Sequence, residues 1–373
     1  MNSTGNTPAP AQRLLSLDLF RGITMFLLVA ESTYLYSALS RFTPEGSLLN
    51  GLVLQFHHHP WNGLRFWDLV QPFFMFIVGV AMVFSLEKRW ARGDTWNQTF
   101  RHIVRRCFIL FWFGVILHCG YSRELVWELW NVLTQLSFTI LVAFLIYRLP
   151  VSRQLAISIG LLFLTEITYR LFPVEGFDQP FVKGHNFGSW MDIALMNTIN
   201  SGGWVAVNCV PTAAHTIWGV LAGKILISMR NSPEKIRILA IAGLIGLAVG
   251  YGMDWTGITP IIKRICTSSF VFASGGWCLL VLSFSYWLVD VRGYKRFVSF
   301  FALVGMNPIF IYMFSETAGK QWFNRFIAIF SEGFFGWFGL EGTGVSVVSA
   351  LVTLALEWYL CYWLFTRKIF IRI

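Results

Sequence analysis

Long apolar stretches restrict what this chain can fold into. A membrane-spanning helix needs about 20 consecutive, mostly apolar residues, and ten segments of the sequence approach that requirement. The predicted spans are residues 17–39, 64–86, 103–119, 127–147, 155–171, 205–227, 236–253, 268–289, 297–314 and 345–365. We therefore expect an all-α polytopic membrane protein, a bundle of about ten transmembrane helices.

Composition excludes several other classes of protein. Only 13% of the residues are charged and 55% are hydrophobic, whereas soluble chains carry about 25% charged residues. The net charge is +10, but the basic residues form no single patch, which argues against nucleic acid as a partner. The six cysteines contain no CxxC pair, so we interpret them as buried thiols, neither a disulfide framework nor a zinc site.

The distribution of basic residues predicts the orientation. With the N-terminus placed inside, nine of the 29 Lys and Arg fall outside, which leaves 20 on the cytoplasmic side. The outer nine are Arg41, Arg65, Arg123, Arg170, Lys183, Lys263, Arg264, Lys320 and Arg325. This positive-inside bias predicts that both termini are cytoplasmic. We expect residues 1–12 to be a disordered polar tail and residues 13–373 to form a single transmembrane domain.

Three loops are long enough to do more than connect spans. The outer loops at residues 40–63 and 173–204 offer places for substrate contacts. The inner loop, EKRWARGDTWNQTFRHIVRR, is strongly basic. One explanation is that these basic residues set the membrane topology and lie next to anionic lipid. The other is that they bind the phosphates of a nucleotide-containing donor.

Polar residues interrupt the apolar spans. An ionisable group at the centre of a membrane helix costs at least about 2.5–3.5 kcal/mol, so each one needs a partner or a function. The interrupting residues are Glu31, Asp68, Asn131, Gln135, Asn208, His215, Asn307 and Glu357. Any one of them is explained by hydrogen bonds between helices, but together they predict a polar cavity.

Two smaller patterns refine this prediction. Asn131 and Gln135 are four residues apart, so they share one helix face and either bind a polyhydroxylated ligand or pair with another helix. Pro211 and Pro308 lie inside spans, where each is expected to bend its helix and to expose backbone carbonyls to a cavity.

A run of histidines precedes the second span in the segment QFHHHPWNGLRFWDLV. His57, His58 and His59 are followed by Asp68, ten residues after His58. Three adjacent side chains do not converge easily on one metal ion. An interfacial role and a general-base role both remain, because a neutral imidazole accepts a proton near neutral pH.

Two sequence blocks resemble a known family. The segments RLLSLDLFRGITMFLLVAE and HHPWNGLRFWDLVQPFFMFIVGVAMVFS, with the later GMNPIFIY, are similar to motifs of the heparan-alpha-glucosaminide N-acetyltransferase family. The likeness is strong from Arg13 to about Ser85 and weaker afterwards. The chain departs from the family's pattern at Ala30 and Glu31, where lysosomal members carry an Asn, and at Gln71, where Phe is usual. From this resemblance we expect no counterpart of the luminal domain that precedes the spans in lysosomal members.

The resemblance implies a membrane acetyltransferase. Acetyl-CoA would bind as co-substrate at the cytoplasmic face, and the acetyl group would pass to the amino group of glucosamine, or of a terminal glucosamine of a glycan, on the periplasmic side. It also implies that the family's catalytic histidine corresponds to His58, and it suggests a homodimer in membrane lipid, in a bacterial inner membrane, without a metal.

The residues expected at the site fall into three groups. The catalytic pair is His58, as base, with Asp68, which fixes the imidazole tautomer. The donor phosphates are assigned to Asp18, Arg21, Lys88, Arg89, Arg101, Arg105 and Arg106, although Asp18 and Arg21 also suit an intrahelical pair. The acceptor is assigned to Glu31, Trp61, Asn62, Asn131, Gln135, His215 and Asn307. Asn307, Asn131 or a backbone N–H is expected to support the oxyanion.

Two rival functions use the same features. O-acetylation of a cell-surface polysaccharide needs the same base, because a hydroxyl acceptor also loses a proton. A sugar transporter also carries polar residues in its spans and broken helices. The residues do not decide between direct transfer and an acetyl-histidine intermediate, and they do not identify the acceptor sugar.

Overall fold

The computed structural model describes residues 14–339 and 342–371. Within these ranges the secondary structure is helical, and Asn62 and Ile262 form an isolated β-bridge. The prediction of an all-α protein is confirmed for this part of the chain. The predicted tail at residues 1–12, together with Arg13, lies outside the described residues.

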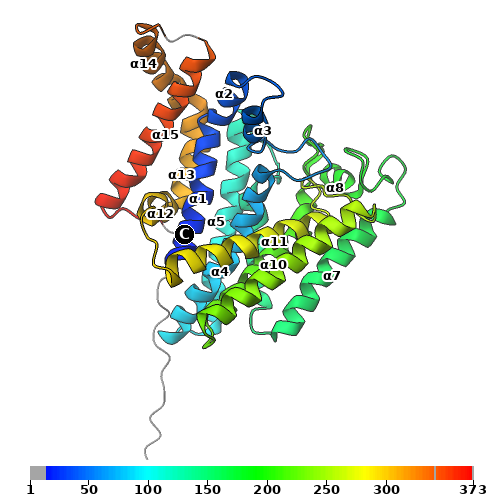
Figure 1. The fold of residues 1–373 in the computed structure, drawn as a ribbon. Coiled ribbons are helices and arrows are strands. Elements are labelled where there is room, and N and C mark those ends of the chain that lie inside the picture. The colour runs from blue at the N-terminus through cyan, green and yellow to red at the C-terminus, as the bar shows by residue number, and fades with distance from the viewer. Residues whose placement is uncertain (1–13, 340–341, 372–373) are drawn as a thin grey trace, which may run out of the picture.

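The helices follow one another in chain order with short connections (Figure 1). Their bounds are α1 (Leu15–Ser32), α2 (Leu35–Phe42), α3 (Leu48–Leu54), η1 (Phe66–Leu69), α4 (Val70–Ala91), α5 (Trp96–Ser122), α6 (Val132–Leu145), α7 (Val151–Arg170), α8 (Phe187–Met196), η2 (Ala206–Asn208), α9 (Cys209–Ile227), α10 (Ser232–Trp255), α11 (Ser268–Ser285), η3 (Tyr286–Val291), α12 (Val298–Met306), α13 (Pro308–Phe314), η4 (Ser315–Phe323), α14 (Asn324–Gly336) and α15 (Thr343–Thr366).

Each predicted span overlaps at least one of these helices. Seven helices of the described part are long and apolar enough to cross a membrane, or eight if the bent pair Val298–Met306 and Pro308–Gly336 counts as one span. α1 has 18 residues that include Asp18, Arg21 and Glu31, and α6 has only 14 residues. The structure thus supports a helical membrane protein, while the count of ten and the cytoplasmic termini stay predictions.

Side-chain caps explain where several helices begin. Thr95 and Gln98 form a capping box at the start of α5, in which each side chain bonds the other's backbone N–H. At α10 the Asn231 side chain accepts from the Glu234 N–H at 2.9 Å, and Pro233 occupies the first turn, where no backbone bond is lost.

Three local features differ from the prediction. Asn131 is not inside a helix, because its side chain caps α6 by accepting from the Leu133 N–H at 2.8 Å. The first predicted span is broken between α1 and α2, where Tyr34 has φ of 62°. Pro211 does not break its helix, since it lies in the first turn of α9, where its missing N–H costs no bond.

Pro308 does mark a sharp bend, as predicted. The axes of Val298–Met306 and Pro308–Gly336 differ by 74°. Asn307 lies at this break between α12 and α13.

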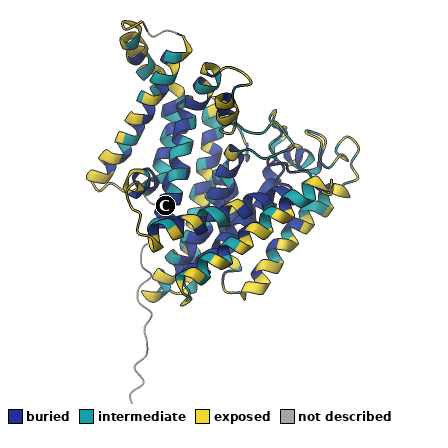
Figure 2. Cartoon of the chain, in the orientation of Figure 1, coloured by how far each residue is buried: buried dark blue, intermediate teal, exposed yellow. Residues whose placement is uncertain are grey.

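The surface of the bundle is apolar where helices lie on its outside. In α7 and α10 only 17% of the most apolar window is buried, against 67% for the span that contains α4. Figure 2 shows the same contrast between the outer helices and the centre. Exposed residues such as Phe163, Leu164, Leu244 and Ile245 suit contact with lipid rather than water.

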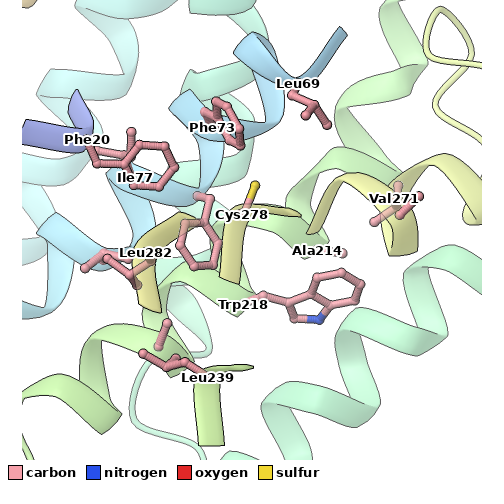
Figure 3. Close-up of a cluster of buried hydrophobic side chains, with 14 of the residues drawn as sticks. Phe20, Leu69, Phe73, Ile77, Ala214, Trp218, Leu239, Val271, Cys278 and Leu282 are labelled. Atoms are coloured by element: carbon pink, nitrogen blue, oxygen red, sulfur yellow. The ribbon is translucent and has the colours of Figure 1, made fainter. Parts of the chain in front are cut away.

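The centre of the bundle is closely packed. Phe20, Phe73, Trp218 and Val271 belong to a buried cluster that joins α1, α4, α9 and α11 (Figure 3). α4 and α9 approach so closely that a Cβ atom on Gly79 would lie 2.1 Å from the Thr216 carbonyl oxygen. Small residues allow such contacts between membrane helices, and this packing fixes α4, which directly follows η1 and its Asp68.

Candidate functional site

A polar cavity of about 620 Å³ opens within the bundle. Its walls come from α1, α2, α4, α5, α6, α13 and η4, and from the segments that precede η1 and α9 and follow α10. The volume is typical of sites for small ligands. The polar cavity predicted from the interrupted spans is therefore present.

His58 lies in the wall of this cavity and contacts Asp68. Its Nδ1 atom is 2.9 Å from the Asp68 Oδ1 atom. An ionised carboxylate only accepts hydrogen bonds, so we assign the proton to Nδ1. That tautomer leaves Nε2 as the acceptor, as a general base requires.

The chain around the histidines holds Asp68 in place. The Asp68 Oδ2 atom accepts from the backbone N–H groups of His59 at 3.1 Å and Arg65 at 3.0 Å. The Arg65 side chain in turn donates to the His58 carbonyl at 3.1 Å. These bonds arise within one short segment, so the motif builds much of its own geometry before any long-range contact.

Lys263 completes this group from a distant part of the chain. Its Nζ atom lies 3.2 Å from His58 Nδ1 and 3.7 Å from Asp68 Oδ1. The bridge between Asn62 and Ile262, with the Gly63 N–H donating to the Ile261 carbonyl at 2.8 Å, positions its segment. The sequence analysis identified Lys263 only as one of the basic residues on the outer side. Lys263 and Arg264 form a basic pair in a predicted outer segment, where basic residues are uncommon. This pair could have indicated a functional role.

Burial and charge keep His58 neutral. Burial, with the nearby Lys263 ammonium, lowers the pKa of His58 to about 4, against the opposing influence of Asp68. The side chain is 37% exposed, and it lines the cavity. Burial also lowers the pKa of Lys263 to about 8, although Asp68 acts in the other direction. The imidazole is therefore ready to accept a proton at neutral pH.

Aromatic rings enclose the histidine. The Trp204 ring centroid lies 5.4 Å from that of His58 in an edge contact, and the Lys263 Nζ atom lies 5.3 Å from the same indole. Trp67 packs on another side, 6.3 Å from the imidazole. These rings reduce the access of water to the base, which strengthens charge interactions there.

The neighbouring histidines have other surroundings. His57 lines the cavity, with Nε2 3.3 Å from the Tyr36 carbonyl oxygen. His59 packs against Gly63, and burial and Arg65 lower its pKa. Of the three, His58 has the orienting carboxylate. Among the described residues no group of three or more His, Cys, Asp or Glu side chains is arranged to hold a metal ion.

Asn131 and Gln135 both line the cavity, as their four-residue spacing predicted. Gln135 accepts a short hydrogen bond from Gln71, the position where the chain departs from the family pattern. The Asn131 Nδ2 atom is 3.5 Å from the Tyr312 hydroxyl. Both amides thus lie at the cavity, although each also has a partner in the protein.

Glu31 lies in the same cavity and contacts a pair of residues that the sequence reasoning missed. The Lys320 Nζ atom donates to Glu31 Oε2 at 3.0 Å and also contacts Glu316 Oε1 at 3.0 Å. The Tyr121 hydroxyl donates to Glu316 Oε2 at 2.7 Å. We call Glu31, Glu316, Lys320 and Tyr121 the charged wall. Residues 315–344 were predicted to be a connection, so nothing there suggested a site.

Four residues predicted to bind the acceptor do not line the cavity. Trp61 donates from Nε1 to the Phe181 carbonyl at 2.8 Å, and Asn62 is exposed at its bridge. His215 is fully buried, with Nε2 2.8 Å from Ser274 Oγ. Asn307 donates to the Ile369 carbonyl and accepts from the Ile371 N–H, both at 2.9 Å. Each has a partner within the protein, so the structure does not bring these four residues to the cavity, and their assignments to the acceptor, with that of Asn307 to the oxyanion, stay predictions.

A narrower pocket of about 130 Å³ adjoins the cavity. The two share Leu28, Phe74, Val132 and Tyr312 as lining residues. The lining of this inner pocket is mostly aliphatic, and it includes Arg21 and Arg106. The Arg106 Nε atom is buried and has no hydrogen-bond partner in the described part of the chain.

The other residues predicted to bind the donor lie outside this lining. Asp18 accepts from Arg21 at 2.7 Å, which is the intrahelical pair that the spacing allowed. Arg89 is bound to Asp94 at 3.1 Å. Lys88, Arg101 and Arg105 are exposed. Of the basic group, the structure therefore brings only Arg21 and Arg106 to the pocket that meets the cavity.

Comparisons with known proteins agree with the motifs. A sequence family described as a domain of unknown function (DUF5009) matches residues 13–196. The heparan-alpha-glucosaminide N-acetyltransferase of Homo sapiens is 25% identical over 379 residues, covering 84% of this chain and 54% of the relative. The protein of that name from Mus musculus is 25% identical over 370 residues, covering 82% and 54%. The chain spans about half the length of these relatives, and the predicted resemblance is confirmed.

Proposed function

We propose that this relative of the heparan-alpha-glucosaminide N-acetyltransferases transfers an acetyl group from acetyl-CoA to the amino group of glucosamine, or of a terminal glucosamine of a glycan. The observation that carries the proposal is the His58–Asp68 pair, 2.9 Å apart, beside a cavity that shares lining residues with a pocket containing two arginines. Such a transfer needs a base and a path by which the donor thioester reaches that base.

The chemical step uses His58 as a general base. The amine nitrogen attacks the thioester carbonyl carbon and passes its proton to His58 Nε2, and the carbon–sulfur bond then breaks to release CoA as a thiolate. Asp68 stabilises the imidazolium that forms, because it accepts the hydrogen bond from Nδ1. The proton leaves His58 for the thiolate or for water in the cavity.

The inner pocket supports the donor part of the proposal. Its aliphatic lining suits the thin pantetheine arm, and Arg21 and Arg106 offer charge-assisted bonds to phosphate groups at its far end. The side chain of Arg106 is held among apolar groups with an unpartnered Nε atom, and a buried cation is costly unless an anion pairs with it. Acetyl-CoA would supply that anion.

The cavity also offers a donor for the oxyanion. Asn131 Nδ2 has only a long contact, 3.5 Å, to the Tyr312 hydroxyl, and it lines the cavity with His58. We assign it to the developing negative charge on the carbonyl oxygen. A single amide donor of this kind contributes on the order of 10²-fold or more to kcat.

The proposed orientation follows from the basic residues. The ends of α4 and α5 that flank the basic loop would face the cytoplasm, so that Arg21 and Arg106 lie toward the inner side and His58 toward the outer side. Both termini would be cytoplasmic, in a bacterial inner membrane, and the chain is proposed to pair as a homodimer.

Release of CoA tests the proposal directly. Purified protein with acetyl-CoA and glucosamine should release free thiol, and His58→Ala should lower kcat by about 10²–10⁴-fold. His185→Ala, which alters an exposed loop histidine, is the matched control and should retain wild-type activity. Sugar uptake without thiol release would contradict the proposal and favour a transporter. Thiol release only with hydroxyl acceptors would favour O-acetylation.

A second experiment separates two routes of transfer. Rapid quenching with labelled acetyl-CoA and no acceptor should leave His58 unmodified if the amine attacks the thioester directly. An acetylated histidine that goes on to product would instead show the covalent route.

A further inference from the structure

The charged wall is not used by the acetyl-transfer mechanism described above. It contains two carboxylates and one ammonium group, with Lys320 between Glu31 and Glu316 at 3.0 Å from each. Such buried ion pairs contribute little to stability, because desolvation offsets most of the attraction. Three charged groups in the wall of a membrane cavity therefore need a functional explanation.

The backbone presents the charged wall to the cavity in an uncommon way. Glu316 and Lys320 belong to η4, a π-helix over Ser315–Phe323, whereas Glu31 comes from α1 and Tyr121 from α5. π-helical segments are rare and often occur at functional sites. Here the segment turns both charged side chains toward the cavity, where all four residues of the wall are lining residues.

A further buried carboxylate lies behind the wall. Glu357 of α15 is 1% exposed, and neither of its carboxylate oxygens has a hydrogen-bond partner in the described part of the chain. It packs directly on η4, because a Cβ atom on Gly319 would lie 3.0 Å from Glu357 Oε1. The wall is thus backed by a third acidic side chain.

The charged wall keeps hydrogen-bonding capacity that faces the cavity. Glu31 bonds Lys320 through Oε2, and 36% of its side chain is exposed, so Oε1 is available to a ligand. The Lys320 side chain is 24% exposed, and its ammonium group carries three N–H donors. A carboxylate acceptor beside an ammonium donor suits neighbouring hydroxyl groups, each of which both donates and accepts.

We propose that the charged wall is the subsite that binds the ring hydroxyl groups of the acceptor. The acceptor class is then a polyhydroxylated amine, held by its hydroxyl groups at Glu31 and Lys320 while its amino group faces His58. This inference rests on the proposed function for the amine, but the binding of the ring does not require transfer.

The test separates ring binding from catalysis. N-acetylglucosamine keeps the ring hydroxyls and lacks the free amine, so calorimetry with this probe measures binding without acetyl transfer. Glu31→Gln should weaken its binding by about tenfold and raise the KM for glucosamine similarly. The KM for acetyl-CoA should change by less than about twofold. Lys320 keeps its contact with Glu316 at 3.0 Å in this variant, which favours normal folding.

Two further variants keep the test decisive. Tyr121→Phe removes only the hydroxyl that orients Glu316 and should weaken binding of N-acetylglucosamine by a smaller factor. Glu332→Gln changes an exposed carboxylate of α14 and should have no effect on binding. Thermal melting checks that each variant is folded.

The outcomes distinguish the two proposals. Wild-type protein that binds N-acetylglucosamine but releases no CoA would defeat the proposed function and retain the subsite. Wild-type protein that transfers acetyl groups, with binding unchanged in Glu31→Gln, would defeat the subsite and retain the function. Cyclohexylamine is an amine without hydroxyl groups. If Glu31→Gln lost activity equally toward glucosamine and toward cyclohexylamine, recognition of the ring hydroxyls by the charged wall would also be contradicted.

Discussion

The outer cavity and the inner pocket differ in how their polar groups are bound. In the cavity, His58, Asp68 and Lys263 contact one another within 2.9 to 3.7 Å, and the two glutamates of the charged wall share Lys320. In the pocket, whose lining is mostly aliphatic, Arg21 is paired with Asp18 at 2.7 Å, whereas Arg106 Nε is unpartnered among the described residues.

This difference indicates that the cavity and the pocket have different functions. A set of groups already bonded to one another is suited to proton transfer, because little reorganisation is needed during the reaction. An apolar channel with cations at one end is suited to a flexible, anionic donor. Variants in the cavity should therefore change kcat or acceptor binding, and variants in the pocket should change the KM for the donor.

The largest effect is expected at Asp68. Asp68→Asn removes the carboxylate that orients His58 and contacts Lys263, so kcat should fall by about 10²–10⁴-fold. The KM for acetyl-CoA should change little, since Asp68 does not line the inner pocket. Steady-state kinetics with Asp178→Asn, an exposed loop carboxylate, as control would measure this. If Asp68→Asn instead raised only the KM for acetyl-CoA, the assignment of catalysis to the cavity and of donor binding to the pocket would be contradicted.

The second effect is expected at Arg106. Arg106→Met should raise the KM for acetyl-CoA by about 10–100-fold, because a charge-assisted bond contributes about 1.5–3 kcal/mol. The KM for glucosamine should stay near that of wild type. Arg153→Met, on the exposed face of α7, serves as the control for the loss of one positive charge. An unchanged donor KM would exclude the inner pocket as the donor route.

Lys263 should control the pH dependence of the reaction. The imidazole acts as a base only when neutral, so kcat/KM, calculated on the concentration of neutral acceptor amine, should fall as pH drops through the pKa of His58, about 4. Lys263→Met removes a charge that lowers this pKa, so the acid limb should move upward, toward the ordinary value of 6.5. Lys263→Arg keeps the charge and should keep the limb. A limb that does not move in Lys263→Met would contradict this assignment.

The smallest effect is expected from salt. The exposed Lys88, Arg101 and Arg105 should attract the phosphates of acetyl-CoA over distance, and salt screens such attraction. Raising the ionic strength from about 0.05 M to 0.5 M should lower kcat/KM for acetyl-CoA by less than about tenfold. If salt changed kcat/KM equally for acetyl-CoA and for the acceptor, the proposed distinction between the inner pocket and the outer cavity would be contradicted.

The sequence predicted the parts of the site that are built from local segments. His58 and Asp68 lie in one motif, and backbone bonds within that motif hold the carboxylate. Asn131, which caps α6, and Gln135, four residues later in that helix, both line the cavity. Local spacing was sufficient in both cases.

The missed residues depend on contacts between distant segments. Lys263 is 205 residues from His58, and Lys320 is 289 residues from Glu31. No periodicity relates such positions, and only the packing of the helices brings them together. The same limit explains Asn307 and His215, whose buried polar groups bond to neighbouring segments that their own sequence does not specify.

A sided transfer assay tests the central claim most directly. Protein is reconstituted in vesicles with glucosamine sealed inside and acetyl-CoA added outside, so that only molecules with the inner pocket facing outward meet the donor. The account predicts N-acetylglucosamine within the lumen, and its loss in both His58→Ala and Arg106→Met. Product that forms only when donor and acceptor share one compartment would contradict a thioester delivered through the bundle to His58.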